Sequence, residues 1–235
     1  MMDYLKLDST RISFGEYWRW KPGPAFPILA ACKLLRVKFP TEILIPAVTR
    51  IDVVEPATQP CDLVEALGEP IRNCRESGYE LSFWYVTPVI GTIVGLGAAL
   101  LRSDGLTVAA AVAGQTRDGR NREVHLGLAS RVLRGRYLVT GGGGSLFDAA
   151  PEVEPLRLRG RSHSELLHAH AGRVDGRRAE VVAVEDVREL VKELEQLEID
   201  ANRRRGIYVP ASIADVAEIT RKQDAGGVVG GGDAG

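Results

Sequence analysis

A regular series of strand-like runs in the middle of the chain restricts its fold more than any other feature. These runs are rich in apolar and β-branched residues, and turn sequences such as Arg102-Ser103-Asp104-Gly105 separate them. This spacing is typical of consecutive antiparallel strands joined by hairpins. It predicts an antiparallel meander of about five to six strands, a common sheet size. The runs cover residues 81–89, 92–101, 106–114, 124–132 and 137–140.

Helical patterns stand on both sides of this central series. Apolar residues recur at helical spacing over 62–77, and Ser162 with Glu165 forms a capping box for a short helix over 164–171. Residues 186–205 form a long amphipathic pattern whose acidic start and basic end suit the helix dipole. The sequence therefore predicts an α+β fold with helices packed on one face of the sheet and a long amphipathic helix near the C-terminus.

Changes in composition divide the chain into four predicted parts. Residues 1–55 are expected to form an N-terminal arm or appended layer, and residues 56–182 the α+β core. Residues 183–224 carry the C-terminal helices. Residues 225–235 are mostly glycine and have too little apolar surface to become ordered.

The overall composition excludes several classes of protein. The chain has 235 residues, of which 45% are hydrophobic, so it has enough apolar material for a core. The formal net charge is −1, so nucleic-acid binding is not expected. Three cysteines without a CxxC pair argue against a disulfide framework or a zinc ribbon. The first residues do not form a signal peptide, so a cytoplasmic location is expected.

Two segments leave a membrane-associated protein open as an alternative. Residues 81–101 carry no charged side chain and are long enough to span a bilayer as a helix. Pro88 and several glycines interrupt this run, so two strands fit it better. The cationic stretch 17–38 could instead lie in a lipid interface. The alternative for that stretch is that Trp18 and Trp20 pack against the sheet.

Three histidines near residue 165 form the most suggestive cluster for metal chemistry. On a helix, His163 and His170 share a face, whereas His168 points elsewhere. The i,i+4 histidine pair of a zinc-protease helix is missing, so a metal site would need a ligand from another segment, such as His125. We therefore expect a surface helix with His168 packed against the sheet, and no metal.

A glycine run follows the last strand of the meander. Gly141 to Gly144 stands where a phosphate-binding loop would stand, but the Gly-Lys-Ser/Thr sequence and a following helix are missing. Ser145 could form a catalytic triad with His168 and Asp148 if folding brings them together. A hydrolase or metal-dependent enzyme with a site near Ser145, His163 and His168 is thus an alternative function.

Arginines at one predicted hairpin tip form the strongest candidate binding surface. Arg117, Arg120 and Arg122 could bind an anion, but aromatic side chains that would stack on bases are missing nearby. The same charges would also discourage pairing between sheet edges. Because catalytic and cofactor motifs are missing, the sequence predicts a binding or interaction module without a cofactor. Its partner is an unknown protein or a small anionic ligand, and its oligomeric state is left open.

Overall fold

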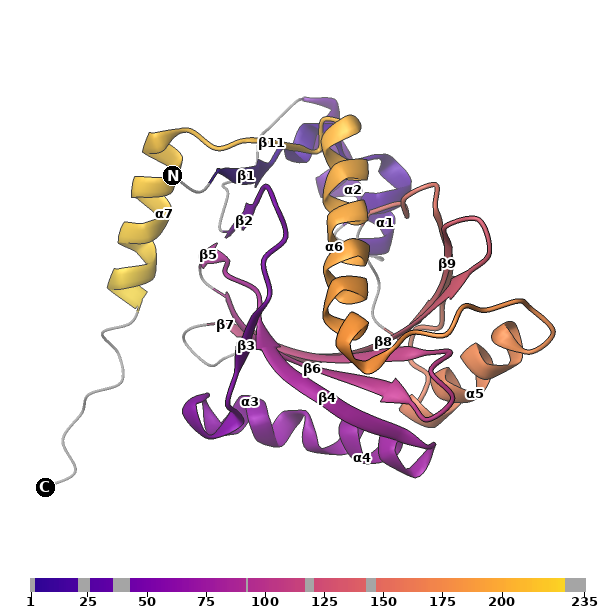
Figure 1. Cartoon of the computed structure of the whole chain (residues 1–235). Coiled ribbons are helices and arrows are strands. Elements are labelled where there is room, and N and C mark those ends of the chain that lie inside the picture. Colours follow the sequence, from indigo (N-terminus) through magenta and orange to yellow (C-terminus); the bar gives the residue numbers. More distant parts are fainter. Residues whose placement is uncertain are drawn as a thin grey trace, which may run out of the picture.

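The structure is a computed structural model that describes residues 3–20, 26–35, 43–91, 93–116, 121–142 and 147–226. Within these residues the chain forms a mixed α+β fold with two sheets (Figure 1). The predicted α+β class and its antiparallel content are confirmed, but the sheets and the packing of the helices differ from the prediction in detail.

The larger sheet contains the predicted meander and extends beyond it. Its strands are β3 (Asp52–Val54), β4 (Tyr79–Val86), β6 (Ile93–Arg102), β7 (Val108–Thr116), β8 (Arg122–Val132), β9 (Arg136–Gly141) and β10 (Val153–Arg157). The strand order is β10-β9-β8-β7-β6-β4-β3. Five of the strands, β4 and β6 to β9, form the antiparallel series. The edge strand β10 pairs in parallel with β9, so the sheet is mixed.

A smaller antiparallel sheet joins the first residues of the chain to the segment near its end. Its strands are β1 (Tyr4–Leu7), β2 (Ile43–Pro46), β5 (Ile90–Gly91) and β11 (Tyr208–Pro210), in the order β11-β1-β2-β5. In the larger sheet, β3 belongs to the predicted N-terminal part and pairs with β4 of the predicted core. The division at residues 55, 182 and 224 stays a prediction, and residues 227–235 of the predicted tail lie outside the described residues.

The uncharged run 81–101 folds into strands. It contributes to β4, to the short β5 and to β6, so the prediction that it forms strands is confirmed, with one short strand more than expected, and the helical span is wrong. Residues 93–101 of β6 carry no charge, and both faces of the strand are buried there, with Leu100 on one side and Leu101 on the other. Across the described residues, no helix combines the length and the apolar character needed to cross a membrane.

Helices pack on both faces of the larger sheet, which corrects the prediction that they cover one face (Figure 1). Helices α3 (Cys61–Ala66), α4 (Gly68–Glu76) and α5 (His163–Val174) pack against one face through side chains such as Leu63, Ile71 and Leu166. Helix α6 (Val187–Arg204) packs Val187 and Leu190 against the other face. The prediction failed because the strands are apolar on both sides.

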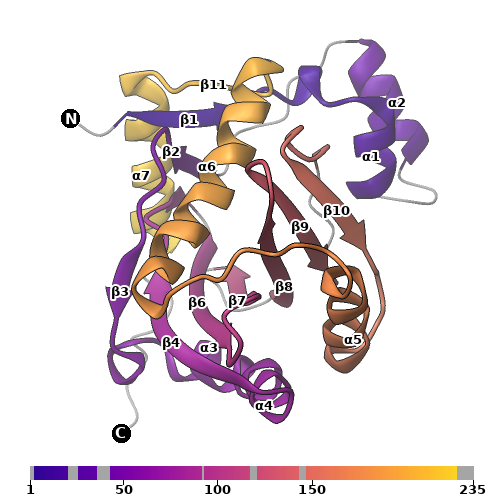
Figure 2. The same ribbon diagram turned by 45° about the vertical axis from the view of Figure 1, so that its right-hand side comes forward.

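The remaining helices lie outside these two layers. Helices α1 (Phe14–Trp20) and α2 (Phe26–Leu34) form one corner of the molecule, and α7 (Ile213–Gly226) lies beside the smaller sheet (Figure 2). Trp18 is 52% exposed and meets Phe26 edge-on, so the prediction that it packs against the sheet is wrong. The side chain of Trp20 lies outside the described part. Short 3-10 helices span Ser9–Arg11 (η1), Pro56–Thr58 (η2) and Val184–Asp186 (η3).

Candidate functional site

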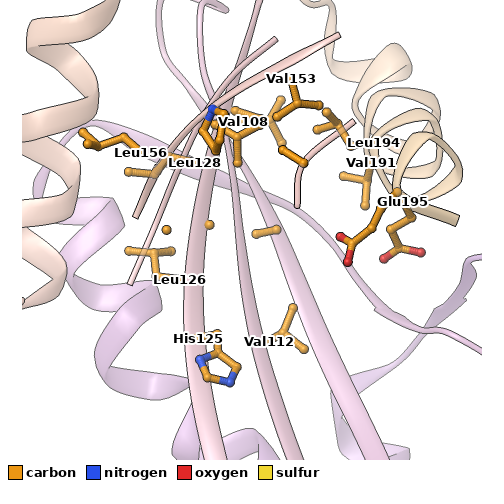
Figure 3. Close-up of a pocket in the computed structure, with 18 of the residues that line it drawn as sticks. Val108, Val112, His125, Leu126, Leu128, Val153, Leu156, Val191, Leu194 and Glu195 are labelled. Carbon is orange, nitrogen blue, oxygen red and sulfur yellow. The ribbon is translucent and has the colours of Figure 1, made fainter. Parts of the chain in front are cut away.

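A cavity of about 460 Å³ lies between α6 and the larger sheet (Figure 3). It exists because α6 packs over Ala99 and Leu101 of β6, while the neighbouring strands carry small side chains on the same face. Ala110 of β7 and Gly127 and Ala129 of β8 line this space. Since these residues are too short to reach α6, the packing of helix on sheet leaves an open volume.

The helical wall of the cavity carries two carboxyl groups, that of Glu195 and that of the more exposed Glu198. Val191, Leu194 and Glu195 of α6 face the strands that carry Val108 and Val112 (Figure 3). Within the described residues, the Glu195 carboxylate makes no hydrogen bond or ion pair. A carboxylate in such surroundings is costly to keep ionised, because apolar neighbours do not replace its hydration.

The environment of Glu195 favours the neutral, protonated form of its carboxyl group. Burial and, secondly, the nearby Glu198 carboxylate raise the pKa of Glu195 from 4.5 to about 7. The other ionisable groups that line the cavity are Tyr85 of β4, His125 of β8 and Arg157 of β10. Near pH 7 the carboxyl group can therefore either donate or accept a hydrogen bond. Shifted carboxyl groups in clefts are frequent at functional sites.

Replacing Glu195 by glutamine should stabilise the protein at high pH. The folded state raises the pKa of Glu195. This shift leaves the free energy of unfolding unchanged below the ordinary pKa of 4.5 and lowers it as the pH rises toward about 7. We expect Glu195→Gln to raise the free energy of unfolding by about 2 kcal/mol at about pH 8 and to change it little at about pH 4. Urea unfolding at both pH values measures this. The control Glu189→Gln, at an exposed position on the same helix, should show no such difference. Equal effects of Glu195→Gln at both pH values would contradict the assignment.

A second, polar cavity of about 340 Å³ shares His125 and Leu126 with the first. His163, Arg159 and Arg161 also line it. His163 and His125 thus line one space, as the metal hypothesis required. Over the described ranges, however, no group of three or more His, Cys, Asp or Glu side chains is placed to hold a metal ion.

The other two candidate histidines lie in different environments. His168 is exposed, whereas His170 is fully buried, so the prediction that His168 packs against the sheet is wrong. The helix presents His170 to the sheet in place of His168, because its buried stripe contains Leu166, Leu167, His170 and Val174. His163, His168 and His170 therefore do not form a joint site.

His170 belongs to a buried hydrogen-bond network. Its Nε2 lies 3.0 Å from Ser130 Oγ, and its Nδ1 lies 2.9 Å from Thr140 Oγ1. Ser130 Oγ in turn lies 3.0 Å from Thr107 Oγ1. Burial, with a contribution from Arg173, lowers the pKa of His170 to about 4, so the ring is neutral at pH 7. Neither Ser130 nor His170 lines the two cavities, so this Ser–His pair joins α5 to the sheet instead of facing a substrate.

The remaining predicted site residues are not brought together by the described structure. Ser145, Arg117 and Arg120 lie outside the described residues. Arg122 is exposed at the start of β8, where its Nη1 donates to the Asp62 carbonyl. Among the described residues, the basic side chains Arg159 and Arg161 line the second cavity, whereas Arg122 does not.

Comparison with known proteins gives no match. None of the protein-family models, curated proteins or solved structures that were searched resembles the chain. Similarity to a known protein therefore assigns no role to any of these side chains.

Proposed function

We propose that the protein binds a small, predominantly apolar molecule in the cavity between α6 and the larger sheet. The observation that carries the proposal is a cavity of about 460 Å³ whose surface is mostly apolar. Ligand pockets are commonly apolar spaces of roughly 300–1,000 Å³ with a few polar groups that orient the ligand. Ordinary packing defects are much smaller, because protein interiors contain few voids larger than a water molecule.

Glu195 is the group that we expect to orient this ligand. Its carboxyl group faces the cavity and has Glu198 one turn away on the same helix. The Glu195 carboxyl group among apolar neighbours disfavours an anionic group beside it and favours a hydroxyl or basic nitrogen. The proposal therefore gives a ligand class to the binding module that the sequence predicts. An anionic ligand of the kind predicted there would fit the arginines of the second cavity better than this end of the first.

Filling the cavity should abolish binding of an apolar probe. A Cβ atom at Gly127 would have the Ala110 carbonyl oxygen at 3.9 Å as its only close neighbour, so a side chain can be added without displacing the strand. We expect Gly127→Leu to occupy the cavity and to weaken binding of the fluorescent probe N-phenyl-1-naphthylamine by about tenfold or more, which is about 1.4 kcal/mol. Fluorescence titration measures the affinity, and circular dichroism verifies folding.

The matched control for this test is Gly114→Leu. Gly114 is also a strand glycine, and a Cβ atom there would have only contacts of 3.9 Å and longer, but Gly114 does not line the cavity. This variant should bind the probe as the wild type does. The proposal fails if the wild type does not bind the probe, or if the folded Gly127→Leu protein binds it with unchanged affinity.

A further inference from the structure

The corner formed by α1 and α2 exposes a group of large apolar side chains. Phe14 is 42% exposed, Trp18 52%, Leu34 74% and Leu35 77%. The two helices form one surface, because Trp18 of α1 meets Phe26 of α2 edge-on, and the Lys33 ammonium group lies 5.4 Å from the centre of the Phe14 ring. Figure 2 shows this corner beyond the end of β10. We call these four exposed residues the apolar corner.

The segment that carries the apolar corner is rich in basic residues. Residues 17–41 contain five Lys or Arg and no Asp or Glu. In the fold, Arg157 lies close enough to Arg19 and Arg159 for their charges to contribute to lowering its pKa, after burial. Arg159 Nη2 donates to the backbone carbonyl of Arg19 at 2.8 Å, which draws this basic group against α1.

The acidic groups next to α1 are already neutralised. Glu16 is fully buried and accepts a hydrogen bond from Arg205 Nη2 at 2.6 Å. Asp148 forms an ion pair with Arg19. Among the described basic side chains near α1 and α2, Lys33, Arg157 and Arg159 donate to backbone carbonyls and make no ion pair, so they leave positive charge beside the exposed aromatic and leucine side chains. This combination is typical of helices that lie in the interface of an anionic bilayer.

We infer that α1 and α2 dock this corner of the protein on an anionic membrane surface. Trp18, Leu34 and Leu35 enter the headgroup region, and Arg159 and Lys33 contact lipid phosphates. The chain stays on one side of the bilayer in this arrangement, because the insertion is limited to side chains of the corner.

Helix α1 also contacts a loop that lines the proposed ligand cavity. Glu16 Oε1 accepts a hydrogen bond from the backbone N–H of Asp148 at 2.9 Å, so α1 holds the loop that contains this residue. The next two residues, Ala149 and Ala150, line the cavity. The membrane inference does not depend on ligand binding, because it rests on the apolar corner and its charges.

Vesicle co-sedimentation of the full chain tests the inference. We expect the wild type to sediment with vesicles of phosphatidylcholine and phosphatidylserine, more weakly with phosphatidylcholine alone, and less at high salt. The double variant Leu34→Ser/Leu35→Ser should bind the anionic vesicles about tenfold more weakly or worse. The matched control is Val184→Ser/Ile213→Ser, which changes residues that are 65% and 81% exposed elsewhere on the surface. The control should bind as the wild type does.

Three outcomes would overturn the inference. The first is that the wild type fails to sediment with anionic vesicles. The second is that the control variant loses as much binding as the Leu34/Leu35 variant. In the third outcome, sedimentation velocity shows a dimer that Leu34→Ser/Leu35→Ser abolishes, while vesicles bind neither protein. That result would assign the apolar corner to contact with a second copy of the chain.

Discussion

Gly97→Ala is expected to destabilise the protein by about 3 kcal/mol, although it adds a single methyl group. A Cβ atom at Gly97 would lie 2.3 Å from Tyr85 Cζ and 2.5 Å from Tyr85 Cε1. Atoms do not approach so closely, so the Tyr85 ring must move. Tyr85 is 3% exposed and packs in the cluster between the sheet and α6, so moving its ring toward the adjoining cavity breaks these packing contacts. Gly97 is therefore required because an aromatic ring lies flat on its strand.

Urea unfolding of a double-mutant cycle measures this effect. Tyr85→Leu removes the ring, so Gly97→Ala should cost much less in the Tyr85→Leu background than in the wild type. Gly127→Ala on β8 is the control, because its Cβ atom would have ordinary contacts only. If Gly97→Ala changes the free energy of unfolding by less than about 0.5 kcal/mol, the close packing of Tyr85 on β6 is wrong.

Glu16→Ala is expected to cost about 3 kcal/mol of stability, because it removes a fully buried carboxylate that accepts hydrogen bonds from three part-buried donors. Arg205 Nη2 donates to Glu16 Oε1 at 2.6 Å, and the backbone N–H groups of Ser13 and Asp148 donate to the carboxylate at 2.7 Å and 2.9 Å. One side chain thus connects α1, the residue that follows α6 and the loop beside the cavity. Burial by itself would raise the pKa of Glu16, but the hydrogen bonds, first among them that of Arg205, lower it to about 2.

The pH dependence of stability identifies this contribution. Because the folded state lowers the pKa of Glu16, its contribution is present above the ordinary value of 4.5 and is lost as pH falls toward about 2. Wild type and Glu16→Ala should therefore differ most near neutral pH and converge in acid. The control Glu218→Ala removes an exposed pair with Lys222 and should change stability by less than about 1 kcal/mol. A pH-independent difference for Glu16→Ala would contradict the charged hydrogen-bond network.

Local rules predicted much of the fold. The capping box of Ser162 and Glu165 begins α5, and the turn that ends at Gly105, with φ 72°, joins β6 to β7. Both features depend on residues that are close in the sequence. The assignment of helices to faces could not be predicted in the same way. Strands with apolar residues on both sides accept helices on either face, and the choice depends on contacts between distant segments.

The candidate site was harder to predict for the same reason. The cavity forms where β7, β8, the loop near Ala150 and α6 come together, and no pattern of residue spacing in the sequence predicts these contacts between distant segments. One local signal was available. Glu195 follows Val191 by four residues, so a carboxylate stands within the apolar stripe of α6. A charged residue in such a stripe is either paired or functional, and Glu195 is unpaired within the described structure.

Methyl NMR during a titration with N-phenyl-1-naphthylamine tests the central claim most directly. The probe has two apolar destinations, the cavity and the apolar corner, and methyl groups report on each separately. Binding in the cavity predicts that the methyl resonances of Val108, Val191 and Leu194 shift with one saturable affinity, and that Gly127→Leu abolishes these shifts. Shifts confined to Leu34 and Leu35, with the cavity methyl groups unchanged, would contradict the proposed ligand site.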